Sequence, residues 1–158
     1  MRINTLLFVI IVFSSFWITG SSNEMFKDTE GRGEEFPPSM SGKININETD
    51  YEMLVGNYKW ERKQGLYTQV VQTDAISPYQ IADNFESVRV EPNDKINIQI
   101  EGNPQITVYL WNENGREMEV MLNDKQVLIP NSKGHNIYEV LAKWPDGELS
   151  YTFVLEVR

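Results

Sequence analysis

The sequence predicts an all-β fold, an antiparallel sandwich of about seven strands formed by residues 86–158. Residues 136–157 show a period-2 alternation of apolar and polar side chains on both sides of Pro145-Asp146-Gly147, which is typical of a β-hairpin. Five more β-like segments precede this hairpin, with turn residues in every gap and no long helical periodicity. A hairpin this apolar needs a second sheet to cover it.

Residues 1–20 are predicted to be a signal peptide or an uncleaved N-terminal anchor. Arg2 precedes an apolar run that is shorter than the roughly 20 residues of a membrane span. Small residues at Gly20, Ser21 and Ser22 suit cleavage by a signal peptidase. The same stretch resembles a bacterial lipoprotein leader with Ser21 in place of the lipidated cysteine, and a hydroxyl does not replace the thiolate in that reaction.

Residues 21–50 are predicted to be a disordered linker. They are rich in Asp, Glu, Gly, Ser and Pro and hold few large apolar residues, so they bury too little surface to offset the entropy of ordering. The triplet Asn47-Glu48-Thr49 matches a glycosylation sequon. After a leader of bacterial type, we interpret this match as chance.

Residues 51–85 are predicted to be an N-terminal β extension that packs on the sandwich. Residues 51–60 indicate one strand interrupted at Gly56, and residues 66–73 indicate another. A helical turn is expected to begin at Pro78. Several aromatic residues lie in this extension, where they either cover an open sheet edge or fill a core, or else form a binding face.

The strands expected in the sandwich are residues 87–91, 95–101, 106–111, 117–122, 126–129, 136–144 and 150–157. Asn114-Gly115 is a strong hairpin signal. In the Pro145-Asp146-Gly147 turn, the glycine is expected to take a positive φ.

The second half of the chain carries a pattern of spaced core positions. Trp111 lies on the third expected strand, Ile98 precedes it by thirteen residues, and Val140 follows Tyr138 by two. In these positions, residues 86–158 resemble a cysteine-free immunoglobulin-like domain of a small bacterial secreted or lipoprotein-type envelope protein. The resemblance implies that Trp111 packs behind Tyr138, whose hydroxyl bonds to upstream backbone. The structural core residues expected are Ile98, Trp111, Tyr138, Val140 and Phe153.

Composition argues against several kinds of function. The formal net charge of −9 disfavours nucleic acid as a partner, and the absence of cysteine excludes disulfides and thiolate chemistry. His135 is the only histidine and lies in a polar segment, so neither a catalytic triad nor a zinc site is expected. Turn residues such as Asn112 and Asn114 lack the spacing of a calcium loop. We therefore expect no catalytic residue, no cofactor and no metal.

The function predicted from these observations is a non-enzymatic extracytoplasmic binding or structural module of the bacterial cell envelope. Its partner is expected to be an envelope protein, a peptide or a glycan, with membrane association through the N-terminal segment only. The alternative is an immunoglobulin-like protease inhibitor that acts through end loops, at residues 102–105, 131–135 and 145–148. Fold alone does not decide between them.

Overall fold

The computed structural model describes residues 35–74, 76–129 and 133–158. These residues belong to one unit of the chain, Glu34–Arg158. The predicted leader, residues 1–20, and residues 21–34 of the predicted linker lie outside the described residues. Within the described ranges, no helix combines the length and hydropathy needed to cross a membrane.

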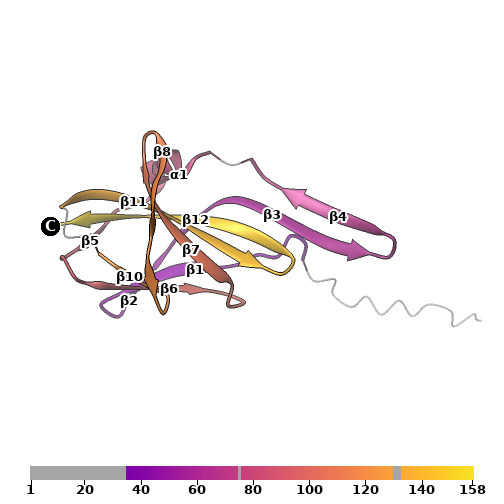
Figure 1. Cartoon of the computed structure of the whole chain (residues 1–158), viewed down its shortest axis with the longest axis horizontal. Coiled ribbons are helices and arrows are strands. Elements are labelled where there is room, and N and C mark those ends of the chain that lie inside the picture. Colours follow the sequence, from indigo (N-terminus) through magenta and orange to yellow (C-terminus); the bar gives the residue numbers. More distant parts are fainter. Residues whose placement is uncertain (1–34, 75, 130–132) are drawn as a thin grey trace, which may run out of the picture. The chain divides into compact units, whose positions relative to one another are not determined.

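Two sheets form the fold and confirm the predicted all-β sandwich (Figure 1). The strands of the first sheet are β1 (Gly42–Ile46), β2 (Thr49–Glu52), β6 (Lys95–Ile100), β9 (Leu122–Asn123) and β10 (Gln126–Leu128). The strands of the second are β3 (Leu54–Gln64), β4 (Tyr67–Gln72), β5 (Val88–Val90), β7 (Gln105–Asn112), β8 (Gly115–Val120), β11 (Gly134–Trp144) and β12 (Gly147–Val157). The strand orders are β2-β1-β6-β10-β9 and β4-β3-β12-β11-β7-β8.

The strand β5 lies outside this second order and pairs with the far end of β12. This pairing is parallel, with Val88 registered on Leu155. The other strand pairs of the described chain are antiparallel, as predicted. The central strand β12 is thus bonded to β11 along one edge and to β3 and β5 along the other.

The prediction of a disordered linker over residues 21–50 is wrong for its last part, because β1 and the start of β2 fall within residues 42–50. The strand β1 lies between β2 and β6, where Ile44 and Ile46 are buried in the core. Burial of two isoleucines contributes several kcal/mol, about 1.5–3 for each side chain, and outweighs the polar composition around them. The sandwich therefore begins well before residue 86, and β3 is an integral strand rather than an added layer.

The single strand predicted over residues 117–122 is two strands in different sheets. The first, β8, pairs with β7 in the second sheet, and β9 pairs with β10 in the first. The chain passes between the sheets at Met121, which is exposed. This crossing closes one side of the sandwich.

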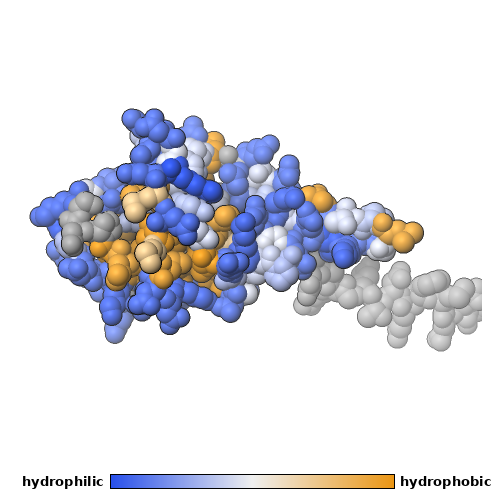
Figure 2. Space-filling view, in the orientation of Figure 1, coloured by the Kyte–Doolittle hydropathy of each residue, from blue (hydrophilic) through white to orange (hydrophobic). Residues whose placement is uncertain are grey.

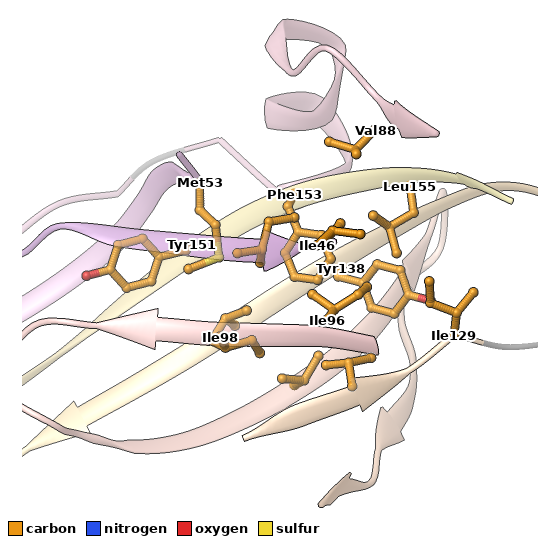
Figure 3. Packing of buried hydrophobic residues seen from close by; sticks show 14 of the residues in the cluster. Ile46, Met53, Val88, Ile96, Ile98, Ile129, Tyr138, Tyr151, Phe153 and Leu155 are labelled. Carbon is orange, nitrogen blue, oxygen red and sulfur yellow. The ribbon is translucent and has the colours of Figure 1, made fainter. Parts of the chain in front are cut away.

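The core lies between the two sheets (Figure 3). Four of the predicted core residues belong to it, because Ile98, Tyr138, Val140 and Phe153 are all buried in one cluster. The rings of Tyr138 and Phe153 stack with centroids 4.9 Å apart and an interplanar angle of 8°. They are cross-strand partners on β11 and β12, so the stack follows directly from the register.

The fifth predicted core residue, Trp111, lies on the opposite face of its sheet. Its cross-strand partner is Ile137, whereas Tyr138 is registered on Leu110. Neighbouring residues of a strand point to opposite faces, so Trp111 does not pack behind Tyr138. It is only partly buried and packs on a second cluster formed by Ala82, Ile137 and Val154.

The resemblance implied a hydrogen bond from the Tyr138 hydroxyl to upstream backbone. This bond is absent from the described part of the chain, where the buried hydroxyl has no partner. A different tyrosine ties the core to upstream backbone. The Tyr151 hydroxyl donates to the carbonyl oxygen of Met40 at 3.0 Å. The Tyr151 ring also lies against Gly42, where an added Cβ would fall 2.7 Å from the ring. These two contacts hold the segment that enters β1.

The turn between β11 and β12 also differs from the prediction. Trp144 is registered on Gly147, which leaves Pro145 and Asp146 as a two-residue turn. Gly147 is not among the described residues with positive φ. Its need for glycine is steric, because an added Cβ would fall 2.4 Å from the Trp60 ring and 2.6 Å from the Lys59 carbonyl oxygen.

The predicted helical turn at Pro78 is confirmed as α1 (Pro78–Ile81), followed by the 3-10 turn η1 (Ala82–Asn84). Ser77 and Gln80 form a capping box, in which each side chain accepts a backbone N–H at the other position. Ile81 and Ala82 are buried. This short element packs on the outer face of the second sheet, next to Trp111.

Candidate functional site

The hairpin formed by β3 and β4 extends the second sheet beyond the sandwich (Figure 1). Its turn is Gly65-Leu66, because Gln64 is registered on Tyr67, and Gly65 has φ of 61°. The Leu66 side chain is fully exposed, and Figure 2 shows an apolar patch at this end of the hairpin. Tyr67 and Val70 are also exposed. The exposed apolar side chains at the end of this projecting element make the hairpin a candidate contact surface.

The strand β4 is an open edge of the second sheet, since no described strand pairs with its other side. The N–H of Thr73 donates to the carbonyl oxygen of Tyr58 at 3.0 Å. Because antiparallel bonding alternates along a strand, Thr68, Val70 and Gln72 direct their N–H and C=O groups toward the open side. These three residues form what we call the β4 edge.

The β4 edge carries none of the usual features that block strand addition. Residues 67–72 contain no proline and no charge, and the pairing of β4 with β3 has no register shift. Natural edge strands are commonly protected by lysine, proline or a bulge. An unprotected edge is therefore a surface suited to pairing with another extended chain.

The base of the hairpin is held rigidly against the sandwich. The rings of Trp60 and Trp144 contact each other with centroids 5.1 Å apart. The backbone N–H of Glu61 donates to the Asp146 carbonyl oxygen at 2.8 Å. The Arg62 guanidinium lies 4.4 Å from the centre of the Phe36 ring, a cation–π contact that joins the incoming chain to the hairpin.

A cavity of about 590 Å³ opens beside this base, lined in part by Phe36, Arg62, Trp144 and Asp146. Trp60 also lines it but is 4% exposed, so little of its ring is available to a ligand. The other two aromatic rings of the lining are partly exposed but already have partners, because Phe36 contacts the Arg62 guanidinium and Trp144 contacts Trp60. We therefore do not assign the cavity a ligand.

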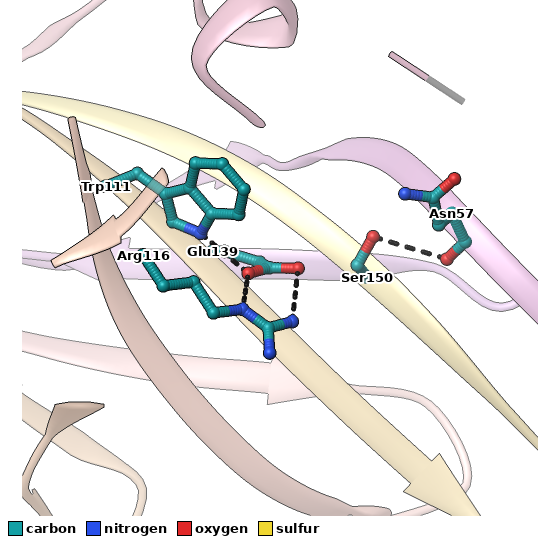
Figure 4. Close-up of polar contacts among 5 residues, drawn as sticks. All are labelled: Asn57, Trp111, Arg116, Glu139 and Ser150. Atoms are coloured by element: carbon teal, nitrogen blue, oxygen red, sulfur yellow. Dashed lines mark hydrogen bonds and ion pairs between the residues drawn. The ribbon is translucent and has the colours of Figure 1, made fainter. Parts of the chain in front are cut away.

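A polar cluster lies on the outer face of the second sheet (Figure 4). The buried carboxylate of Glu139 accepts from Trp111 Nε1 at 2.7 Å, from Arg116 Nε at 2.8 Å and from Arg116 Nη2 at 3.1 Å. These hydrogen bonds with Glu139 raise the pKa of Arg116. The Arg116 guanidinium also lies 4.2 Å from the centre of the Tyr109 ring.

This cluster has the properties of a structural ion pair rather than a catalytic one. Both oxygens of Glu139 already accept hydrogen bonds, so neither is held ready for a substrate proton. A neighbouring cavity of about 470 Å³ is lined by the cations Lys59, Arg116 and Lys143. Each of these three has a carboxylate partner, so their charges do not converge on a ligand.

His135 lies at the start of β11 rather than in a loop. Its Nδ1 is 3.5 Å from a Glu156 carboxylate oxygen, and both side chains are well exposed to solvent. In the described residues, no group of three or more His, Asp or Glu side chains is placed to hold a metal ion.

The loops expected for a protease inhibitor do not gather at one end of the sandwich. Residues 102–105 and 145–148 are adjacent, because Trp144 Nε1 donates to the Glu101 carbonyl oxygen at 3.2 Å. Residues 133–135 lie at the other end of the long strand β11, and residues 130–132 are outside the described ranges. A strand of this length separates its ends by roughly 30 Å, so the three loops do not form one surface.

Comparison of the chain with protein-family models, with curated proteins and with solved structures gives no match. The functional argument therefore depends on the fold and on its surfaces.

The sequence reading missed the β4 edge as a site. The sequence predicts a strand over residues 66–73, but the binding face that it suggests is formed by the aromatic residues nearby. The available signal was the uncharged run from Gln64 to Thr73, which is unusual in a chain of net charge −9. Whether a strand lies at an edge or in the centre of a sheet depends on topology, which local patterns do not specify.

Proposed function

We propose that the protein is a non-enzymatic extracytoplasmic module of the cell envelope that associates with protein partners by strand addition. The observation that carries this proposal is the β4 edge, with three residues whose backbone groups face outward. Main-chain hydrogen bonds provide affinity in this mode, and exposed side chains such as Tyr67 and Val70 provide selectivity.

The location and anchoring remain part of this proposal. The apolar leader of residues 1–20 supports export, with the domain secreted or held at the outer face of the cytoplasmic membrane. Any membrane association is assigned to this N-terminal segment. The described chain enters the fold beside the hairpin, because Phe36 contacts Arg62.

Site-specific photo-crosslinking in the producing cells tests the proposal. A photoreactive residue at Thr68 or Gln72 should give covalent adducts with envelope protein, because these side chains border the open edge. The same residue at Val55, which is 54% exposed on β3, serves as the control. Adducts of equal yield from all three positions, or none from Thr68 and Gln72, would contradict the proposal.

We also propose that residues 86–158 are immunoglobulin-like. Ile98 on β6 and Val140 on β11 support this assignment, because both are buried in one core and come from opposite sheets. The core cysteines of that fold occupy such positions. Ile98→Cys with Val140→Cys should therefore form a disulfide on mild oxidation. Failure to form it in the folded chain would argue against the assignment.

Protease inhibition is the second candidate, now limited to residues 102–105 and 145–148. The contact between Trp144 and Glu101 favours it, because inhibitory loops bind well when they are held rigidly. A panel of proteases tests it directly. Inhibition that is lost when the two loops are exchanged for Gly-Ser segments would support this function, and no inhibition of any protease class would exclude it.

A further inference from the structure

We propose that the β4 edge binds a second copy of this chain, which forms a two-fold symmetric dimer with a continuous sheet. The inference rests on the proposed function, since it assigns the partner of the same edge. A closed dimer would also remove the exposed edge from solution, where it would otherwise favour aggregation.

The bonding pattern of β4 defines a register for this dimer. Antiparallel pairing about a two-fold axis at Val70 places Val70 opposite itself and Thr68 opposite Gln72 of the second copy. These are the residues whose N–H and C=O groups face outward, so all three enter hydrogen-bonded pairs. A shift along the strand would leave at least one of them without a partner.

The charge distribution also suits a second copy. The strand residues that face each other are uncharged, so the two-fold axis brings no like charges together. Lys63 is registered on Thr68, and this pair would face Gln72 of the second copy. Asp74 follows two residues later, just past the end of β4. Lys59, which is registered on Gln72, already pairs with Glu61 of its own copy. The nearest acidic residue that the second copy adds beside the basic hairpin end is therefore Asp74.

The hairpin differs in charge from the rest of the domain, which is strongly acidic. Residues 35–158 hold 11 basic and 19 acidic residues, a net charge of −8, whereas residues 62–73 hold Arg62 and Lys63 and no acid. The hairpin extends these residues away from the acidic sandwich (Figure 1). Two copies could thus pair through their hairpins while the acidic bodies stay apart.

A single strand pair is a small interface. Stable dimers commonly bury about 1,200 Å² or more, which exceeds what one added strand covers. The expected complex is therefore a reversible dimer that dissociates on dilution. This property separates it from irreversible aggregation of an open edge.

Sedimentation equilibrium of the full chain over a wide concentration range tests the inference. The wild-type chain should show a reversible monomer–dimer equilibrium. Val70→Lys places two ammonium groups opposite each other and should raise the dimer dissociation constant by about tenfold. The control is Val55→Lys, which changes an equally exposed valine away from the edge and should dimerise like the wild type.

Charge reversal gives the most specific readout. Val70→Glu should also weaken self-association, but an equimolar mixture of Val70→Lys and Val70→Glu chains should form heterodimers, because the two side chains face each other. This recovery also shows that both variants are folded. A monomeric wild-type chain at every concentration, or equal dimerisation of Val70→Lys, would overturn the inference.

The two proposals fail in different ways. If the purified chain is monomeric while Thr68 still crosslinks to an envelope protein of another mass, the partner is not a second copy and the binding function stands. If crosslinks and dimers are both absent, both proposals are overturned.

Discussion

Gly147 lies against the indole of Trp60, so close that a Cβ at position 147 would fall 2.4 Å from the ring. This relationship fixes the tip of the β11–β12 hairpin to the base of the β3–β4 hairpin. Gly147→Ala should therefore destabilise the fold by about 1–3 kcal/mol, because either the ring or the Lys59 carbonyl must move. Urea unfolding measures this change.

The control for that variant is Gly65→Ala in the exposed turn of the β3–β4 hairpin. Nothing lies within 4 Å of its added Cβ, but its φ is 61°. This variant reports backbone strain alone and should cost about 1 kcal/mol. Equal urea midpoints for Gly147→Ala and the wild type would show that Trp60 is not packed as described.

The two buried tyrosines should respond differently to loss of the hydroxyl. Tyr151→Phe removes the hydrogen bond to Met40 and leaves that carbonyl without its partner, so the expected cost is about 1–2 kcal/mol. Tyr138→Phe removes a hydroxyl that has no described partner, so stability should stay constant or increase. Paired urea midpoints decide the matter, and a greater loss for Tyr138→Phe would mean that its hydroxyl is hydrogen-bonded.

Alkaline pH should destabilise the protein through the same residues. Burial raises the pKa of Tyr138 to about 12, and burial also raises the pKa of Tyr151. An unfolded tyrosine titrates near pH 10, so between about pH 10 and 12 the unfolded state releases protons that the native state keeps. The free energy of unfolding should be constant with respect to these groups below pH 10 and fall above it.

Tyr138→Phe provides the comparison for that pH profile. The variant should lose less stability between pH 10 and 12 than the wild type, by at most about 3 kcal/mol. The remaining decline is assigned to Tyr151. Identical profiles for the variant and the wild type would show that Tyr138 titrates normally in the native state.

Removal of Arg116 should be costlier than removal of the whole ion pair. Arg116→Met leaves the buried Glu139 with Trp111 as its donor, and because Arg116 is half-exposed we expect a cost of about 1–3 kcal/mol. The double variant Arg116→Met with Glu139→Gln should recover part of this loss. A double-mutant cycle in urea measures the coupling, and additive effects would contradict a direct ion pair.

Local patterns predicted the local features of this fold. The helical turn at Pro78, the alternation along β11 and β12, and the buried Ile98 and Val140 all follow from short stretches of sequence. Burial of β1 was not predicted because its short GKINI segment lies in a polar region. The sequence also did not predict which face of the sheet carries Trp111. The strand β7 has apolar residues on both faces, so its pattern does not show which face points into the core.

The candidate site was less accessible to sequence analysis than the core. The residues of the β4 edge are visible as a strand, but an edge is defined by what does not pair with it. That depends on strand order, which joins residues far apart in the chain. The inhibitor loops were expected at one end of the sandwich by resemblance to immunoglobulin-like inhibitors, whereas the length of β11 separates residues 133–135 from the other two loops.

The position of β12 has a kinetic consequence. This strand is the last of the described strands to be synthesised, yet it contacts β3, β5 and β11 and supplies Tyr151 and Phe153 to the core. The first sheet buries its isoleucines only when the second sheet is in place. The nascent chain should therefore not complete its core until β12 has been synthesised. Such late, cooperative folding is expected to be slow, because the essential contacts join residues far apart in the chain.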